Sequence, residues 1–99
     1  MKSLEKQLNS KEAQELYTVL SILDTPKEIS NFLRDLLTIE EIEEAVRRFQ
    51  VVKMLEKGIP FREIQAQTKM SSTTVARINY WLHHGTGGYR QALKKLVSS

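Results

Sequence analysis

Signals that start and stop helices recur along this chain, and they limit its fold more than any other feature. At Thr25-Pro26-Lys27-Glu28, the threonine can cap a helix, the proline suits its first position, and the glutamate completes a capping box. Thr38-Ile39-Glu40-Glu41 repeats this logic, and Gly58 is a natural residue to follow the end of the helix that starts there. Because no segment alternates apolar and polar residues as a half-buried strand does, the sequence predicts an all-α fold.

Apolar residues recur at helical spacing between these signals. A first helix, capped by Asn9 or Ser10, would carry Ala13, Leu16, Leu20 and Leu23 on one face, and a second would carry Ile29, Phe32, Leu33 and Leu36. We expect the third to direct inward Ile42, Ala45, Val46, Phe49, Val52 and Leu55. Beyond Gly58 we expect helices over residues 61–67, 72–84 and 89–97, with a turn at 68–71 and a glycine-rich break at 85–88.

Charge is divided unevenly between the two halves of the chain. Residues 1–46 hold 5 Lys/Arg against 10 Asp/Glu, a net charge of −5, whereas residues 47–99 hold 10 against 2, a net charge of +8. Such asymmetry indicates that the basic half meets a polyanion, although a solvated basic face would explain charge alone equally well. Cysteine is absent, and the charged residues 1–16 contain no apolar run. We therefore expect a soluble, cytoplasmic protein without disulfides, a signal peptide or a membrane span.

The segment FREIQAQTKMSSTTVARINYWL, which begins at Phe61, has the form of a helix-turn-helix. Ile64 and Val75 are the apolar residues expected to hold its two helices together, with Met70 filling the bend. Ser71 is placed to cap the second helix. The bend usually has glycine where this chain has Lys69, and a left-handed lysine costs roughly 1 kcal/mol or more.

Small hydroxyl side chains at the start of the second helix suit the approach to DNA phosphates and base edges. The sequence therefore predicts a recognition helix in a major groove, with a rival interpretation as a helical hairpin that packs against a protein partner. As phosphate contacts we predict Arg62, Lys69 and Arg77, and as base contacts Ser72, Thr73 and Ala76 with Gln65 on the preceding helix; Thr74 belongs to the same DNA-binding set.

A series of short motifs recurs along residues 16–96 in a specific order and spacing. These motifs are Phe32-Leu33-Arg34-Asp35-Leu36-Leu37-Thr38, Glu41-Ile42, Arg47-Arg48, Val51-Val52-Lys53-Met54-Leu55, Gly58, Arg62-Glu63-Ile64, Ser72-Thr73-Thr74-Val75-Ala76-Arg77-Ile78 and Gly87-Gly88-Tyr89. With them, the segment resembles the Trp-repressor superfamily, and specifically its TrpR-like YerC/YecD-type branch. The resemblance implies a six-helix subunit that forms an intertwined homodimer, with a helix-turn-helix projecting from a shared core. It also implies a tryptophan pocket at Thr38, Arg48, Thr74 and Arg77.

Two positions depart from that family pattern. Ile78 and Trp81 fall where the repressor has small residues beside the indole, so their side chains would occupy the space of the ligand. We therefore expect DNA binding that is not gated by a tryptophan corepressor, and no other cofactor. For Trp81 we expect packing in the core, in preference to a stacking platform shared with Tyr80.

Neither metal binding nor catalysis is indicated. The neighbouring pair His83-His84 diverges on a helix and has no cysteine or spaced histidine partner, so we expect no metal site. The carboxylates at the start of the third helix suit its dipole, and no nucleophile is paired with a base. We therefore expect a non-enzymatic protein.

The resulting prediction is a single domain over residues 1–99. The core of so short a chain is thin, so association with a second copy would help to stabilise it. Residues 10–57 would provide the core and dimerisation helices, 60–84 the helix-turn-helix and 86–97 the C-terminal helix. Its function would be that of a sequence-specific DNA-binding transcription regulator, a repressor acting as a homodimer. The alternative is a helical protein-interaction module or an adaptor in a transcription complex.

Overall fold

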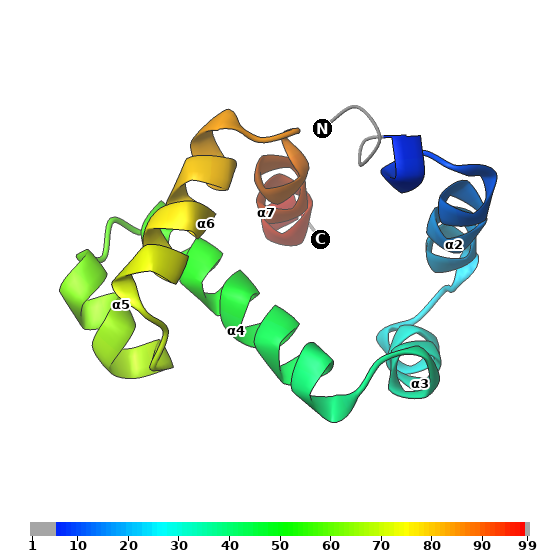
Figure 1. Cartoon of the computed structure of the whole chain (residues 1–99), viewed down its shortest axis with the longest axis horizontal. Helices are drawn as coiled ribbons and strands as arrows, with labels where there is room; N and C mark the ends of the chain where they lie inside the picture. The colour runs from blue at the N-terminus through cyan, green and yellow to red at the C-terminus, as the bar shows by residue number, and fades with distance from the viewer. Residues whose placement is uncertain (1–5, 99) are drawn as a thin grey trace. The chain divides into compact units, whose positions relative to one another are not determined.

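In a computed structural model that describes residues 6–98, the chain is helical throughout, with no strand in that range (Figure 1). A helical turn at residues 6–8 precedes the longer helices. The all-α prediction is confirmed. The helices are α2 Lys11–Ile22, α3 Pro26–Leu36, α4 Ile39–Glu56, α5 Phe61–Thr68, α6 Ser72–His84 and α7 Gly88–Ser98.

Capping side chains begin the helices where the sequence predicts. The Ser10 hydroxyl accepts a hydrogen bond from the Ala13 amide at 3.0 Å, and α2 starts at the next residue. The Thr25 hydroxyl accepts from the Glu28 amide at 3.1 Å and lies 3.4 Å from the Glu28 carboxylate. Each bond satisfies an amide that has no partner within its own helix. These starts therefore depend on residues that are close together in the sequence.

Gly58 ends α4 in the predicted way. Its φ is +79°, which favours glycine, and its amide donates to the Leu55 carbonyl at 3.0 Å. The Ile59 amide donates to the Met54 carbonyl at 3.1 Å. This pair of bonds is the Schellman arrangement, which satisfies the last carbonyls of the helix and turns the chain towards α5.

The helices fall into two compact units, the first of which ends at Ile39. It contains α2 and α3, and neither helix has a fully buried residue. Leu16, Leu20 and Phe32, on the predicted apolar faces, are only half-buried. Ile22 and Leu36 expose 66% and 49% of their surface, so this unit has apolar faces that its own helices do not cover.

The second unit begins at Glu40 and contains the hydrophobic core. As predicted, Val52 points inward on α4, but Val46 is 55% exposed, and the equally buried Val51 was not predicted. Adjacent side chains on a helix point about 100° apart, so both valines are buried only because other helices pack against more than one side of α4. A single apolar stripe in the sequence does not predict this. The core consists of Val51 and Val52 from α4, Ile64 from α5, Met70 from the turn, and Val75, Ile78 and Leu82 from α6.

Arg90 ties α7 to the rest of this unit. One guanidinium nitrogen lies 2.7 Å from the Glu56 carboxylate at the end of α4, and another lies 3.1 Å from Nδ1 of His83 on α6. The two contacts join three helices through one side chain. Tyr89 and Leu93 of α7 also pack against the core.

Candidate nucleic-acid interface

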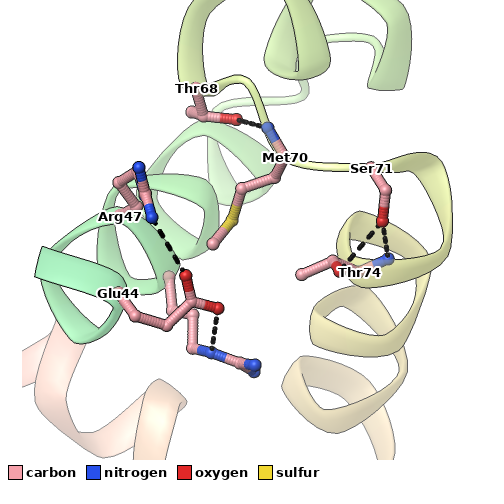
Figure 2. Close-up of polar contacts among 7 residues, drawn as sticks. Glu44, Arg47, Thr68, Met70, Ser71 and Thr74 are labelled. Atoms are coloured by element: carbon pink, nitrogen blue, oxygen red, sulfur yellow. Dashed lines mark hydrogen bonds and ion pairs between the residues drawn. The ribbon is translucent and has the colours of Figure 1, made fainter. Parts of the chain in front are cut away.

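Helices α5 and α6 with the turn between them form the predicted helix-turn-helix. Ile64 and Val75 are fully buried and belong to the same hydrophobic cluster, which also contains Met70, 8% exposed. Figure 2 shows the Met70 side chain pointing from the turn back into the unit. The predicted roles of these three residues in holding the two helices together are confirmed.

The turn is held by a threonine that the sequence analysis did not single out. The Thr68 hydroxyl donates to the Ile64 carbonyl at 2.7 Å and accepts from the Met70 amide at 3.3 Å (Figure 2). The available signal is its place directly after the helix expected over residues 61–67, since a threonine at a helix end can bond to the carbonyl four residues back. Thr68 thus joins the end of α5 to the bend.

Lys69 has the left-handed backbone conformation that its position in the bend implies, with φ 63° and ψ 16°. It is the single non-glycine residue with positive φ within residues 6–98. Its amide donates to the Gln65 carbonyl at 2.9 Å, so the backbone of the bend follows a regular helix cap. The lysine side chain is exposed.

Ser71 caps α6 as predicted. Its hydroxyl oxygen accepts from the Thr74 amide at 3.1 Å and donates to the Thr74 hydroxyl at 3.0 Å (Figure 2). Thr74 is half-buried, so its hydroxyl takes part in the cap. The first turn of α6 is consequently held in place by bonds within the chain.

The remaining predicted DNA-binding residues lie on the outside of the helix-turn-helix. Gln65 is half-buried, and the others are exposed on α5, the turn and the first turns of α6: Arg62, Lys69, Ser72, Thr73, Ala76 and Arg77. Glu63 is the single acidic residue from position 61 to the end of the chain, and its carboxylate accepts from the Gln67 amide nitrogen at 3.2 Å. The exposed face of α6 is therefore free of carboxylates, as a surface that meets phosphates requires.

The predicted ligand residues are spread over both units. Thr38 lies in the first, while Arg48, Thr74 and Arg77 lie in the second. The Arg48 Nε lies 3.2 Å from one carboxylate oxygen of Glu44, and Arg47 lies 3.2 Å from the other. Figure 2 shows the pairing of Glu44 with Arg47. The carboxylate that engages Arg48 in this structure therefore comes from its own helix.

The prediction that Trp81 packs in the core is wrong for the single subunit. Its side chain is 54% exposed, and the neighbouring Leu82 takes the inward position with Ile78. Trp81 instead borders an open hollow of about 350 Å³, lined also by Gly85, Thr86, Gly88 and Tyr89. Residues 78 and 82 are four apart and share a helix face, whereas position 81 is turned away from position 82 by about 100°.

The described part of the chain offers neither a metal-binding cluster nor a membrane-spanning helix. No group of three or more His, Cys, Asp or Glu side chains within residues 6–98 is arranged to hold a metal ion. No helix in that range is long and apolar enough to cross a membrane. Residues 1–5 of the charged N-terminal segment lie outside the described residues.

Replacing Lys69 by glycine should raise the free energy of unfolding by up to about 1 kcal/mol, because glycine adopts positive φ without steric cost but loses more backbone entropy on folding. Urea denaturation followed by circular dichroism measures this change. Lys57, an exposed lysine just after α4 without positive φ, provides the control: Lys57→Gly should be neutral or destabilising. A loss of stability as large as that of Lys57→Gly would show that the left-handed conformation of Lys69 carries no strain.

Known proteins are similar to this chain in both sequence and fold. The model of the Trp repressor protein family matches residues 11–97. The uncharacterised protein YerC of Bacillus subtilis (strain 168) is 32% identical over 89 residues, which cover 90% of this chain and 86% of YerC. The crystal structure of a TrpR-like protein from Eubacterium eligens ATCC 27750 is 30% identical and superposes with a TM-score of 0.86, covering 92% of this chain and 94% of that one. The chain therefore belongs to the Trp repressor protein family, among its TrpR-like, YerC-type members.

Proposed function

We propose that this protein is a sequence-specific DNA-binding transcription regulator, a repressor that acts as a homodimer on a roughly palindromic site. The observation that carries the proposal is the exposed, carboxylate-free face of α6, on a helix whose start is capped and whose inner face is buried. Membership of the Trp repressor family supports a DNA-binding regulator.

The exposed side chains divide into two roles. Ser72, Thr73 and Ala76 are short and lie at the start of α6, so they can approach base edges in a major groove, with Gln65 beside them. The exposed cations Arg62, Lys69 and Arg77 supply phosphate contacts, which position the helix and make the affinity depend on salt. Thr74 acts through the cap it shares with Ser71.

Apolar surface that the subunit leaves exposed supports a homodimer. Ile22 of α2 and Leu36 and Ile39 of the α3–α4 region each expose about half of their surface or more. In the second unit, Leu96 and Val97 expose 53% and 86% beside a largely apolar groove between α4 and α7. Exposed apolar patches of this kind mark association surfaces, and a second copy would bury them symmetrically.

Three observations support DNA binding that is independent of tryptophan. Ile78, where the family's repressor has a small residue, fills part of the core and is 1% exposed. Arg48 is paired with Glu44, and the Thr74 hydroxyl is bonded to Ser71. Two of the four groups that the resemblance assigns to a tryptophan pocket, Arg48 and Thr74, are thus engaged within the chain.

Arg77→Ala should weaken DNA binding by about 1–3 kcal/mol if Arg77 makes a bidentate base contact, with a loss confined to the preferred sequence. If Arg77 instead contacts phosphate, affinity for all duplexes should fall together and the salt slope should decrease by about one. Fluorescence anisotropy against salt, on a duplex selected from a random library and on a random duplex, distinguishes these results.

Arg34→Ala, which removes an exposed arginine from α3, is the matched control and should bind as wild type does. An unchanged affinity of Arg77→Ala on both duplexes would remove Arg77 from the interface. Wild-type affinity that is indifferent to salt would favour the alternative of a protein-interaction module.

Sedimentation at micromolar concentration should give twice the subunit mass of 11.5 kDa, about 23 kDa. Leu36→Glu places a charge on the exposed apolar face of α3 and should weaken dimerisation at least about tenfold, equivalent to 1.4 kcal/mol. Asn31→Glu adds the same charge at an exposed polar position of that helix and should leave the dimer intact. A monomer that binds a palindromic duplex tightly would contradict the proposal.

Titration of free tryptophan by calorimetry should produce no saturable heat, and tryptophan should not raise the affinity for the selected duplex. The physical reason is that Ile78 occupies the core and Arg48 already has a carboxylate partner. Glycine, which has the same charged groups without the indole, is the control ligand. Saturable heat together with a gain in DNA affinity would show that tryptophan is an effector.

A further inference from the structure

The exposed face of α6 extends beyond the predicted DNA-binding residues. Thr73, Ala76 and Arg77 are exposed in its first two turns, and Tyr80 and His84 continue the same face towards its end. Positions 73, 77, 80 and 84 are separated by three or four residues, and position 76 lies four residues before position 80, so their side chains share one face of the helix. Tyr80 is 55% exposed, although it is a large aromatic residue.

Neighbouring rings hold Tyr80 in place on this stripe. Its ring centroid lies 4.9 Å from that of His84 and 5.4 Å from that of Trp81, the latter in an edge-to-face arrangement. No hydrogen bond joins its hydroxyl to a residue in the described part of the chain. Tyr80 therefore presents a polar tip outward on a ring that is already packed from two sides.

The position of Tyr80 along α6 matches the distance from base edges to the DNA backbone. From Thr73 to Tyr80 is seven residues, or about 10.5 Å along a helix axis. The major groove is roughly 12 Å wide and 8.5 Å deep. If α6 enters the groove with its start at the base edges and its axis leading outward, this rise exceeds the depth of the groove and brings Tyr80 to the level of the phosphates.

The charge of the surrounding surface indicates which acceptor the Tyr80 hydroxyl would bond. Between Phe61 and the end of the chain, Glu63 is the one carboxylate of a side chain, and it lies on α5. Arg77 precedes Tyr80 on the exposed face, and no acidic residue occurs on α6. A tyrosine hydroxyl in such surroundings suits a phosphate oxygen as its acceptor.

We propose that Tyr80, held by His84 and Trp81, donates a hydrogen bond from its hydroxyl to a phosphate oxygen on the wall of the major groove. This assignment rests on the proposed DNA-binding function and adds a contact two turns beyond the start of the recognition helix. It serves to position α6 in the groove and does not read sequence, because a phosphate is the same at every base pair.

Tyr80→Phe tests the assignment, since it removes the hydroxyl and keeps the ring contacts. Affinity should fall about three- to tenfold, equally on the selected duplex and on a random one. The same duplexes can be made with single phosphates replaced by neutral methylphosphonates. At one position in each half-site, this replacement should lower the DNA affinity of the wild type but leave the affinity of Tyr80→Phe unchanged. Tyr17→Phe is the control, because its hydroxyl donates at 2.8 Å to the Leu8 carbonyl within the first unit; it should bind DNA as wild type does.

Each other result overturns the assignment in a recognisable way. Equal affinity of Tyr80→Phe and wild type on both duplexes removes the hydroxyl from the interface. A loss confined to the selected duplex makes Tyr80 a base reader, and a changed sedimentation coefficient places it between subunits. If wild type binds neither duplex, the proposed function itself fails, and this contact fails with it.

Discussion

The packing of α6 against α4, α5 and α7 is the interaction on which the rest of this structure depends. Val75, Ile78 and Leu82 lie on one face of α6 and meet Val51, Val52 and Ile64 in a single buried cluster. Complete burial of side chains of this size stabilises a fold by about 1.5–3 kcal/mol each. Because three neighbours surround the inner face, the opposite face of α6 is left to solvent in a defined direction.

Polar bonds at the edge of this core determine where α6 begins and how its neighbours meet it. Thr68 joins the end of α5 to the turn, Ser71 caps α6, and Arg90 connects α7 with α4 and α6. Each is partly accessible to water, so its contribution to stability is modest. Their importance lies in orientation, since a helix that reads a groove must be placed accurately relative to its support.

The first unit contrasts with this arrangement, because α2 and α3 contain no fully buried residue while retaining clear apolar faces. Folded helices whose apolar side chains remain half-exposed gain little from burial within one chain. In the proposed homodimer, the missing burial comes from the second copy. Stability of the N-terminal helices and the spacing of the two recognition helices would then depend on the same association.

The sequence by itself determined the helix boundaries and the helix-turn-helix, because caps and breaks such as Ser10, Thr25, Gly58 and Ser71 act through bonds to residues a few positions away. It also indicated the inner side of the helix-turn-helix, since the three residues predicted to hold its helices together, Ile64, Met70 and Val75, are buried. Only the tertiary structure decided that Leu82 is buried while Trp81 is exposed, and that Val51 is buried while Val46 is exposed. The physical reason is that adjacent or nearby apolar positions differ by rotation about the helix axis, and the shape of the neighbouring helices selects between them.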